Sequence, residues 1–152
     1  NGSIGAPPPP KPNDPVNHPT TGVPLFANFP GFTSGDYVFE PGPIYLKHGK
    51  HTGPHAGFGV IHIVAEHFPN IADAAVATAT ATNLVADILV AGAEIFYEFA
   101  LGKRAERPLV CRTSRGTLVL ERRLDGANVV FYSVVTAFQF ANPPGIKVGV
   151  LT

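Results

Sequence analysis

The chain has 152 residues and a formal net charge of zero, with 45% apolar and 14% charged residues. This length suits one domain, and the composition provides enough apolar side chains for a core. A neutral chain cannot hold nucleic acid by its overall field, so any polyanion site must be local. The single cysteine, Cys111, excludes an internal disulfide framework and cysteine-rich zinc sites.

The N-terminal segment, residues 1–24, holds eight of the sixteen prolines. Proline lacks an amide donor and has a fixed φ, so the segment is expected to be an extended, semi-rigid linker. A partner-binding Pro-rich peptide is the alternative. The folded domain is expected over residues 25–152. The chain has neither a secretory signal pattern nor a methionine, and we expect it to be a fragment of a larger secreted protein.

The next segments alternate between short strands and helices. Strands are expected at 37–40 and 44–46, followed by a loop over 47–55, which is rich in glycine, lysine and histidine. Apolar residues at helical spacing predict a short helix over 60–67. Residues 71–91 predict one or two helices that end before Gly92. Asp73 and Asp87 within this apolar stretch argue against a membrane span.

After Gly92 the apolar period changes to two, which predicts strands. We expect them at 95–101, 109–113, 117–124 and 129–138, with an edge strand at 147–151. Helices that precede an antiparallel meander are typical of the α+β class. The expected fold is therefore α+β, with N-terminal helices packed on a four- to five-stranded antiparallel sheet.

Five of the six histidines lie between residues 48 and 67, and two lysines stand among them. Histidine can take and give a proton near neutral pH, and RNA cleavage by 2′-hydroxyl attack needs such groups together with cations for the phosphate. A solvated surface loop or a tag-like metal binder would have the same composition. The residues concerned are Lys47, His48, Lys50, His51, His55, His62 and His67.

Zinc is disfavoured by the histidine spacings. His51 and His55 are four apart, but Gly53 and Pro54 prevent a helix between them. His62 lies within an apolar helix, where a lone histidine is more often a hydrogen-bonded core residue than a catalyst. We therefore expect neither a metal nor a cofactor.

The predicted sheet carries its own polar groups. Arg122 and Arg123 are adjacent on one strand, so their side chains point to opposite faces and at most one faces a given cleft. Hydroxyl groups on the strand over 129–138 could donate hydrogen bonds to phosphoryl oxygens. The further residues of this kind are Arg112, Tyr132, Ser133 and Thr136.

The string from Gly57 to His67, GFGVIHIVAEH, resembles a signature of nucleases of the barnase/EndoU/colicin/RelE superfamily. These include toxin domains at the C-termini of contact-dependent inhibition and other polymorphic toxins. The resemblance covers roughly residues 44–151. It implies a metal-independent endoribonuclease, with tRNA as the expected target, that a cognate immunity protein neutralises. Ile61 departs from the pattern, since a basic residue is expected there.

The resemblance also implies roles for individual residues. The catalytic group is expected to contain His62, His67, Arg122 and Thr136. Substrate contacts are expected from Lys47, His48, Lys50, His51, His55, Arg112, Arg123, Tyr132 and Ser133. The domain would be a monomer that is delivered from a secreted or cell-surface protein and acts in the cytoplasm of a target cell.

Two other functions fit the same residues. One is a non-catalytic binding or structural domain of a secreted protein, in which the histidines hold a metal or a partner. The other keeps the toxin setting but acts on a nucleotide cofactor.

Overall fold

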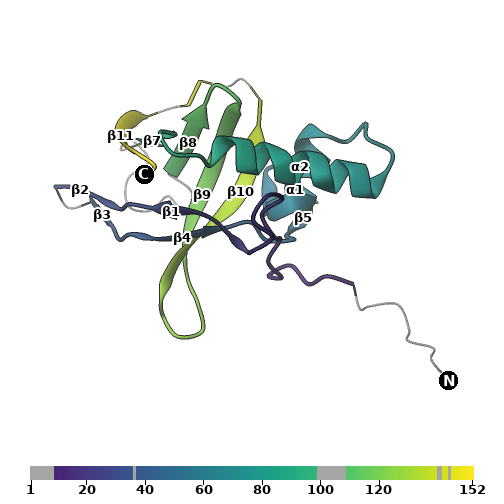
Figure 1. The fold of residues 1–152 in the computed structure, drawn as a ribbon, viewed down its shortest axis with the longest axis horizontal. Coiled ribbons are helices and arrows are strands. Elements are labelled where there is room, and N and C mark those ends of the chain that lie inside the picture. The colour runs from purple at the N-terminus through teal and green to yellow at the C-terminus, as the bar shows by residue number, and fades with distance from the viewer. Residues whose placement is uncertain (1–8, 36, 99–108, 140–141, 144) are drawn as a thin grey trace.

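A computed structural model describes residues 9–35, 37–98, 109–139, 142–143 and 145–152. Its main feature is a curled, seven-stranded mixed sheet in which only the pair β4–β10 is parallel (Figure 1). In spatial order the strands are β1 (Leu25–Phe29), β4 (Gly42–Tyr45), β10 (Val130–Phe138), β9 (Gly116–Leu124), β8 (Leu109–Thr113), β7 (Glu94–Tyr97) and β11 (Ile146–Val150).

Two small hairpins accompany this sheet. One pairs β2 (Phe32–Ser34) with β3 (Tyr37–Phe39), and the other pairs β5 (Lys50–Gly53) with β6 (Ala56–Phe58). The first carries aromatic rings into the core, where Phe32 lies 5.5 Å from Tyr97 between ring centroids. The second leads directly into a helix and carries much of the chemistry described below.

Two helices, α1 (Gly59–His67) and α2 (Ala74–Ile88), lie together beside β10 (Figure 1). The Asp73 carboxylate caps α2 by accepting hydrogen bonds from the amides of Ala75 and Val76 at 2.9 and 3.2 Å. No side chain caps α1. Its first amides instead donate to backbone carbonyls of the preceding segment, at residues 47 and 48.

The core lies on one face of the sheet. Side chains that share this face across β8, β9 and β10 are almost fully buried, and they continue into the buried residues of α1 and α2. Tyr132 is part of this core: its ring lies 4.4 Å from that of Phe29, and its hydroxyl donates to the Glu40 carbonyl at 2.6 Å.

The expected arrangement of N-terminal helices on a four- to five-stranded antiparallel sheet is wrong. Strands make up 43% of the described residues, the two helices found among them lie in the middle of the chain, and the main sheet has seven strands. The error arises at β4, which inserts between β1 and β10 through a parallel pairing of Ile44 with Tyr132. Such a pairing depends on tertiary contacts between distant segments, so local pattern could not reveal it.

Several individual elements were nevertheless predicted. The structure confirms the helix expected at 60–67 and the strands expected at 109–113, 117–124 and 129–138. Residues 71–91 form one helix, Ala74–Ile88, without a break. The expected loop over 47–55 is wrong, because most of it belongs to β5 and its turn. Of the strand expected at 95–101, residues 99–101 lie outside the described part.

Part of the Pro-rich segment lies against the domain. The Val16 amide donates to the Leu46 carbonyl, and the Asp14 and Pro12 carbonyls accept from the amides of His48 and Gly49, at 2.8 to 2.9 Å. These contacts connect the segment to the start of the histidine-rich hairpin. The boundary between residues 24 and 25 remains a prediction. In the described part of the chain, no helix is long and apolar enough to cross a membrane.

Deletion of residues 1–16 is expected to lower the free energy of unfolding by about 1.5–4.5 kcal/mol through three lost backbone hydrogen bonds, each of which contributes about 0.5–1.5 kcal/mol. Urea denaturation measures the change. Deletion of residues 1–10 leaves these bonds in place and is the matched control. Equal stability of the two truncated chains would show that residues 11–16 do not support the domain.

Candidate active site

The site centres on two imidazoles, from β5 and α1. The Nδ1 atoms of His51 and His62 are 2.9 Å apart, and the ring centroids are separated by 5.1 Å. At this distance one nitrogen donates a hydrogen and the other accepts it, so the pair shares one proton. Only 3% of the His62 surface is exposed, whereas His51 is half-buried. His51 is therefore the member of the pair that meets solvent.

A carboxylate lies behind this pair. Glu66, one helical turn after His62, has its Oε1 atom 3.9 Å from His62 Nε2. The same oxygen accepts a hydrogen bond of 2.6 Å from the His55 amide, and this bond is the main reason that the pKa of Glu66 is lowered. Glu66 is therefore ionised at neutral pH. It is absent from the residues predicted from sequence, although its spacing of four from His62 was a usable signal.

The same three side chains could hold a metal ion. Within the described part of the chain, ligand atoms of His51, His62 and Glu66 lie within 4.8 Å of one another. Imidazole and carboxylate ligands suit zinc and other divalent transition metals. Sequence spacing could not show this group, because His51 comes from another element. The absence of a metal requirement remains a prediction.

Two cations, Lys50 and Arg123, lie at the hairpin rung next to that of His51. In the β5–β6 hairpin, the rung Lys50–Phe58 adjoins the rung His51–Gly57. Arg123 lies over the Phe58 ring, and its Nη1 atom donates to the Asn13 side chain at 3.2 Å. Residues 47–55 contain two further residues that were predicted to contact the substrate. His48 is half-buried, and His55 is exposed at the hairpin turn with φ of 58°.

Arg122 does not join this group. Its guanidinium forms two hydrogen bonds with the Glu40 carboxylate, at 2.8 and 3.0 Å, and they lower the pKa of Glu40. Arg122 is exposed and paired across the ladder with Tyr132, which is a core residue. The structure thus brings Arg122, Tyr132 and Glu40 together, on the opposite face of β9 from Arg123.

Of the two remaining members of the expected catalytic group, His67 points away from the pair. His67 follows His62 by five residues, so it points about 140° away around the helix axis. Its ring contacts that of Phe138 in a tilted arrangement with centroids 5.2 Å apart, and partial burial lowers its pKa. The hydroxyl oxygens of Thr136 and Ser133 are buried, and neither has a hydrogen-bond partner among the described residues.

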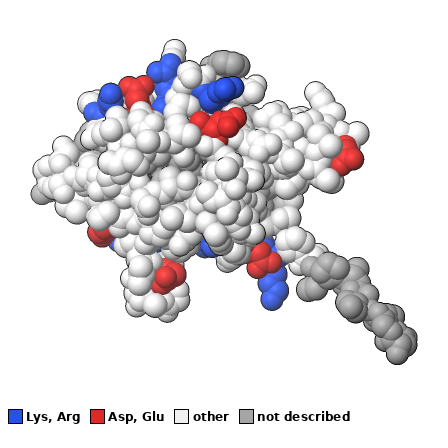
Figure 2. Space-filling view, in the orientation of Figure 1, with Lys and Arg blue, Asp and Glu red and all other residues white. Residues whose placement is uncertain are grey.

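Arg112 belongs to a different charged group. It lies 3.6 Å from Glu94, which also contacts Lys147 at 3.2 Å. Figure 2 shows charged side chains gathered at the rim near β7 and β8, with few on the rest of the visible face. Arg112 lies on β8, which flanks β9 on the side opposite to β10.

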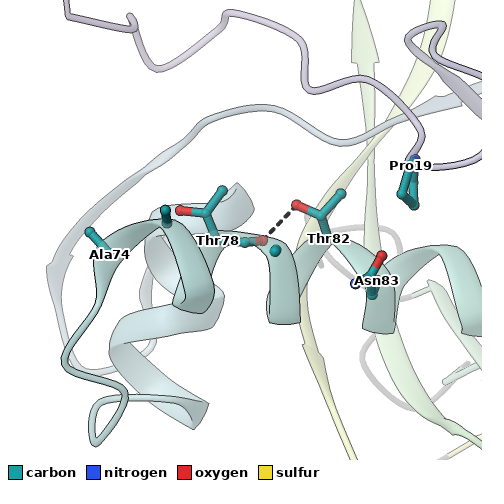
Figure 3. A pocket seen from close by; sticks show the side chains of 7 residues that line it. Pro19, Ala74, Thr78, Thr82 and Asn83 are labelled. Atoms are coloured by element: carbon teal, nitrogen blue, oxygen red, sulfur yellow. Dashed lines mark hydrogen bonds between the residues drawn. The ribbon is translucent and has the colours of Figure 1, made fainter.

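A groove along α2 carries little chemistry. It is lined by Pro19, Ala74, Ala75, Thr78, Ala79, Thr82 and Asn83, none of them titratable (Figure 3). The Thr82 hydroxyl donates to the Thr78 carbonyl at 2.7 Å, so it is already engaged within the helix.

Comparison of the chain with protein-family models, with curated proteins and with solved structures found no match. The resemblance to the nuclease superfamily therefore rests on the sequence motif alone. The function has to be argued from the residues of the site.

Gly57 allows the histidine pair to form. Its φ is +150°, and a Cβ atom there would overlap the Lys50 carbonyl and lie 2.7 Å from His62 Nδ1. Gly57→Ala is expected to lower the free energy of unfolding by about 2 kcal/mol or more, as measured in urea. Gly53→Ala in the same hairpin meets open space and is the control. Similar stability of both variants would contradict the close packing described above.

Proposed function

We propose that the chain is an endoribonuclease domain, which cleaves RNA by attack of a 2′-hydroxyl on the adjacent phosphorus. The observation that carries the proposal is the contact of 2.9 Å between His51 and His62, and the cation Arg123 lies over Phe58 of the same hairpin. A proton-sharing imidazole pair supplies acid–base chemistry near neutral pH, and the cation offsets charge on the phosphate. This local grouping answers the objection that the chain as a whole is neutral.

The burial of the two rings assigns them different tasks. The Nδ1 atom of His51 faces His62, so its Nε2 atom is left for the substrate. His62 is too buried to contact RNA and acts as a positioning residue. In the productive arrangement the Nδ1–H of His51 donates to His62, and the ionised Glu66 favours a proton on His62 Nε2. The logic is that of a base oriented by a third group.

The reaction follows from this arrangement. His51 Nε2 takes the proton of the 2′-hydroxyl, the 2′-oxygen bonds to phosphorus, and the bond from phosphorus to the 5′-oxygen breaks. The 5′-oxygen takes a proton from a second acid, for which His48 and His55 of the same segment are the candidates. The products are a 2′,3′-cyclic phosphate and a free 5′-hydroxyl. In this proposal Arg123 and Lys47 stabilise the phosphoryl oxygens.

The setting is also part of the proposal. The motif from Gly57 to His67 resembles polymorphic toxin nucleases, for which we infer tRNA as substrate and an immunity protein as partner. Delivery from a secreted or cell-surface protein into the cytoplasm of a target cell follows from the same resemblance.

A second function is favoured by one observation. The convergence of His51, His62 and Glu66 is also suited to a non-catalytic domain that binds a divalent metal ion. A chelator separates the two functions, because RNA cleavage through the imidazole pair continues when metal ions are removed.

The whole chain is expected to cleave total RNA in excess EDTA and to leave 2′,3′-cyclic phosphate ends, detected by end-group analysis. His51→Ala should reduce the rate by about 10²- to 10⁴-fold, the range typical of a proton-transfer group. His18→Ala removes an imidazole that packs on Phe26 and is the matched control. RNA left intact by the wild-type chain, or cleaved as fast by His51→Ala, would exclude the proposed mechanism.

Arg123→Ala is expected to slow cleavage by about tenfold or more, since it removes a cation from the phosphate. Arg122→Ala should keep nearly the wild-type rate, because that side chain is bound to Glu40 on the other face of β9. Arg122→Ala removes the same charge from the neighbouring position, so it controls for general effects of charge on RNA binding. A larger loss of rate in Arg122→Ala than in Arg123→Ala would return Arg122 to the catalytic group.

A further inference from the structure

We propose that the surface formed by Tyr45, Lys47, Phe58, Arg123 and Phe131 binds one unpaired nucleotide of single-stranded RNA, with its base on Phe58 and its phosphate between Lys47 and Arg123. We name this surface the cation–aromatic face. The inference rests on the proposed function, for which it specifies the substrate class. It draws on contacts that the histidine pair does not use.

Two cations share one aromatic ring in this face. Lys47 Nζ lies 5.2 Å from the Phe131 ring centroid and 5.3 Å from that of Tyr45. Arg123 Cζ lies 5.7 Å from Phe131 and 5.4 Å from Phe58. All four distances fall within the range of a cation–π interaction. The rings therefore hold both cations at defined positions, although the cations come from segments far apart in the chain.

The two cations are held close despite their like charge. Burial lowers the pKa of Lys47, and the positive charge of Arg123 lowers it further, while Asp14 opposes the shift. Repulsion of this kind is relieved when an anion binds between the charges. A phosphate group suits such a position, because a guanidinium and an ammonium both donate to its oxygens.

A hollow of about 490 Å³ adjoins Arg123. Its volume lies in the range of small-molecule sites, so one nucleotide can enter it. Phe58 and Arg123 form part of its wall, and together they offer a ring and a guanidinium plane for base stacking. The other lining residues are Lys11, Pro12, Asn13, Asp14 and Lys50, with two cations and one carboxylate among them.

The hairpin register connects this hollow to the histidine pair. Phe58 lies opposite Lys50, and the next rung holds His51 opposite Gly57. Successive residues of a strand are about 3.3 Å apart and point to opposite faces, so Phe58 and His51 are neighbours along the hairpin that lie on its two faces. A base within a duplex is stacked on its neighbours on both faces, so it cannot stack on the Phe58 ring. The preferred substrate is thus an unpaired segment, such as a loop or a single-stranded end.

Binding can be tested apart from cleavage with the whole chain carrying His51→Ala. Fluorescence anisotropy measures its affinity for a short fluorescein-labelled RNA, single-stranded or annealed to its complement. We expect the single strand to bind about 5- to 150-fold more tightly, the range typical of one stacked base. Adding Phe58→Leu should remove most of this difference, whereas Phe96→Leu on β7 should not.

The salt dependence tests the phosphate contact. Between about 50 and 200 mM NaCl, Lys47→Gln and Arg123→Gln should each reduce the slope of log K against log salt by about 0.7. Arg122→Gln is the matched control, and thermal melting confirms that each variant is folded. Arg123→Gln leaves the Phe58 ring in place, so the phosphate contact is tested even where Phe58→Leu unfolds the chain.

The outcomes separate the two proposals. Equal affinity for duplex and single strand, an unchanged slope in both cation variants, or displacement of RNA by an equal concentration of polyglutamate overturns the cation–aromatic face. Cleavage by the wild-type chain together with any of these results leaves the ribonuclease proposal standing. Selective binding of single strands without cleavage by the wild-type chain supports the face and rejects the ribonuclease.

Discussion

Two backbone hydrogen bonds hold the start of α1 against the histidine-bearing hairpin: the amides of Val60 and Ile61 donate to the carbonyls of Lys47 and His48 at 3.0 Å. They satisfy orphan donors of a helix that has no capping side chain. The close approach also requires Gly59, with φ of +77°, since a Cβ there would lie 2.5 Å from the Lys47 carbonyl oxygen. The cap of a helix thereby sets the position of His51 relative to His62.

Because side chains alternate along β9, two neighbouring arginines have different partners. Arg122 faces Glu40 and fastens the edge of the core, whereas Arg123 faces the rings and the hollow. Strand geometry makes this division unavoidable, because successive residues point to opposite faces. A chain without net charge can therefore still present a local cationic surface. Lys47 and Arg123 are held over aromatic rings, and their partial burial strengthens their electric field.

Local patterns predicted those parts of the fold that local physics controls. The period of apolar residues revealed α1, β8, β9 and β10, because helix and strand periodicity is written in neighbouring residues. The same patterns failed for the sheet order and for β5, where lysine and histidine occupy strand positions. For the site, residue types indicated the histidines and lysines, and the pairing of His51 with His62 stayed hidden since it joins two separate elements.

The sequence by itself determined the inventory of this protein: one domain with an apolar core, a cluster of imidazoles and lysines, and arginines alternating on a strand. Tertiary structure alone decided which of these groups meet. It joined β4 to β10, brought His51 of β5 against His62 of α1, and placed Arg123 over Phe58 and Phe131 while Arg122 paired with Glu40. The reason is physical: composition and period are properties of adjacent residues, whereas a site depends on contacts between segments that only packing brings together.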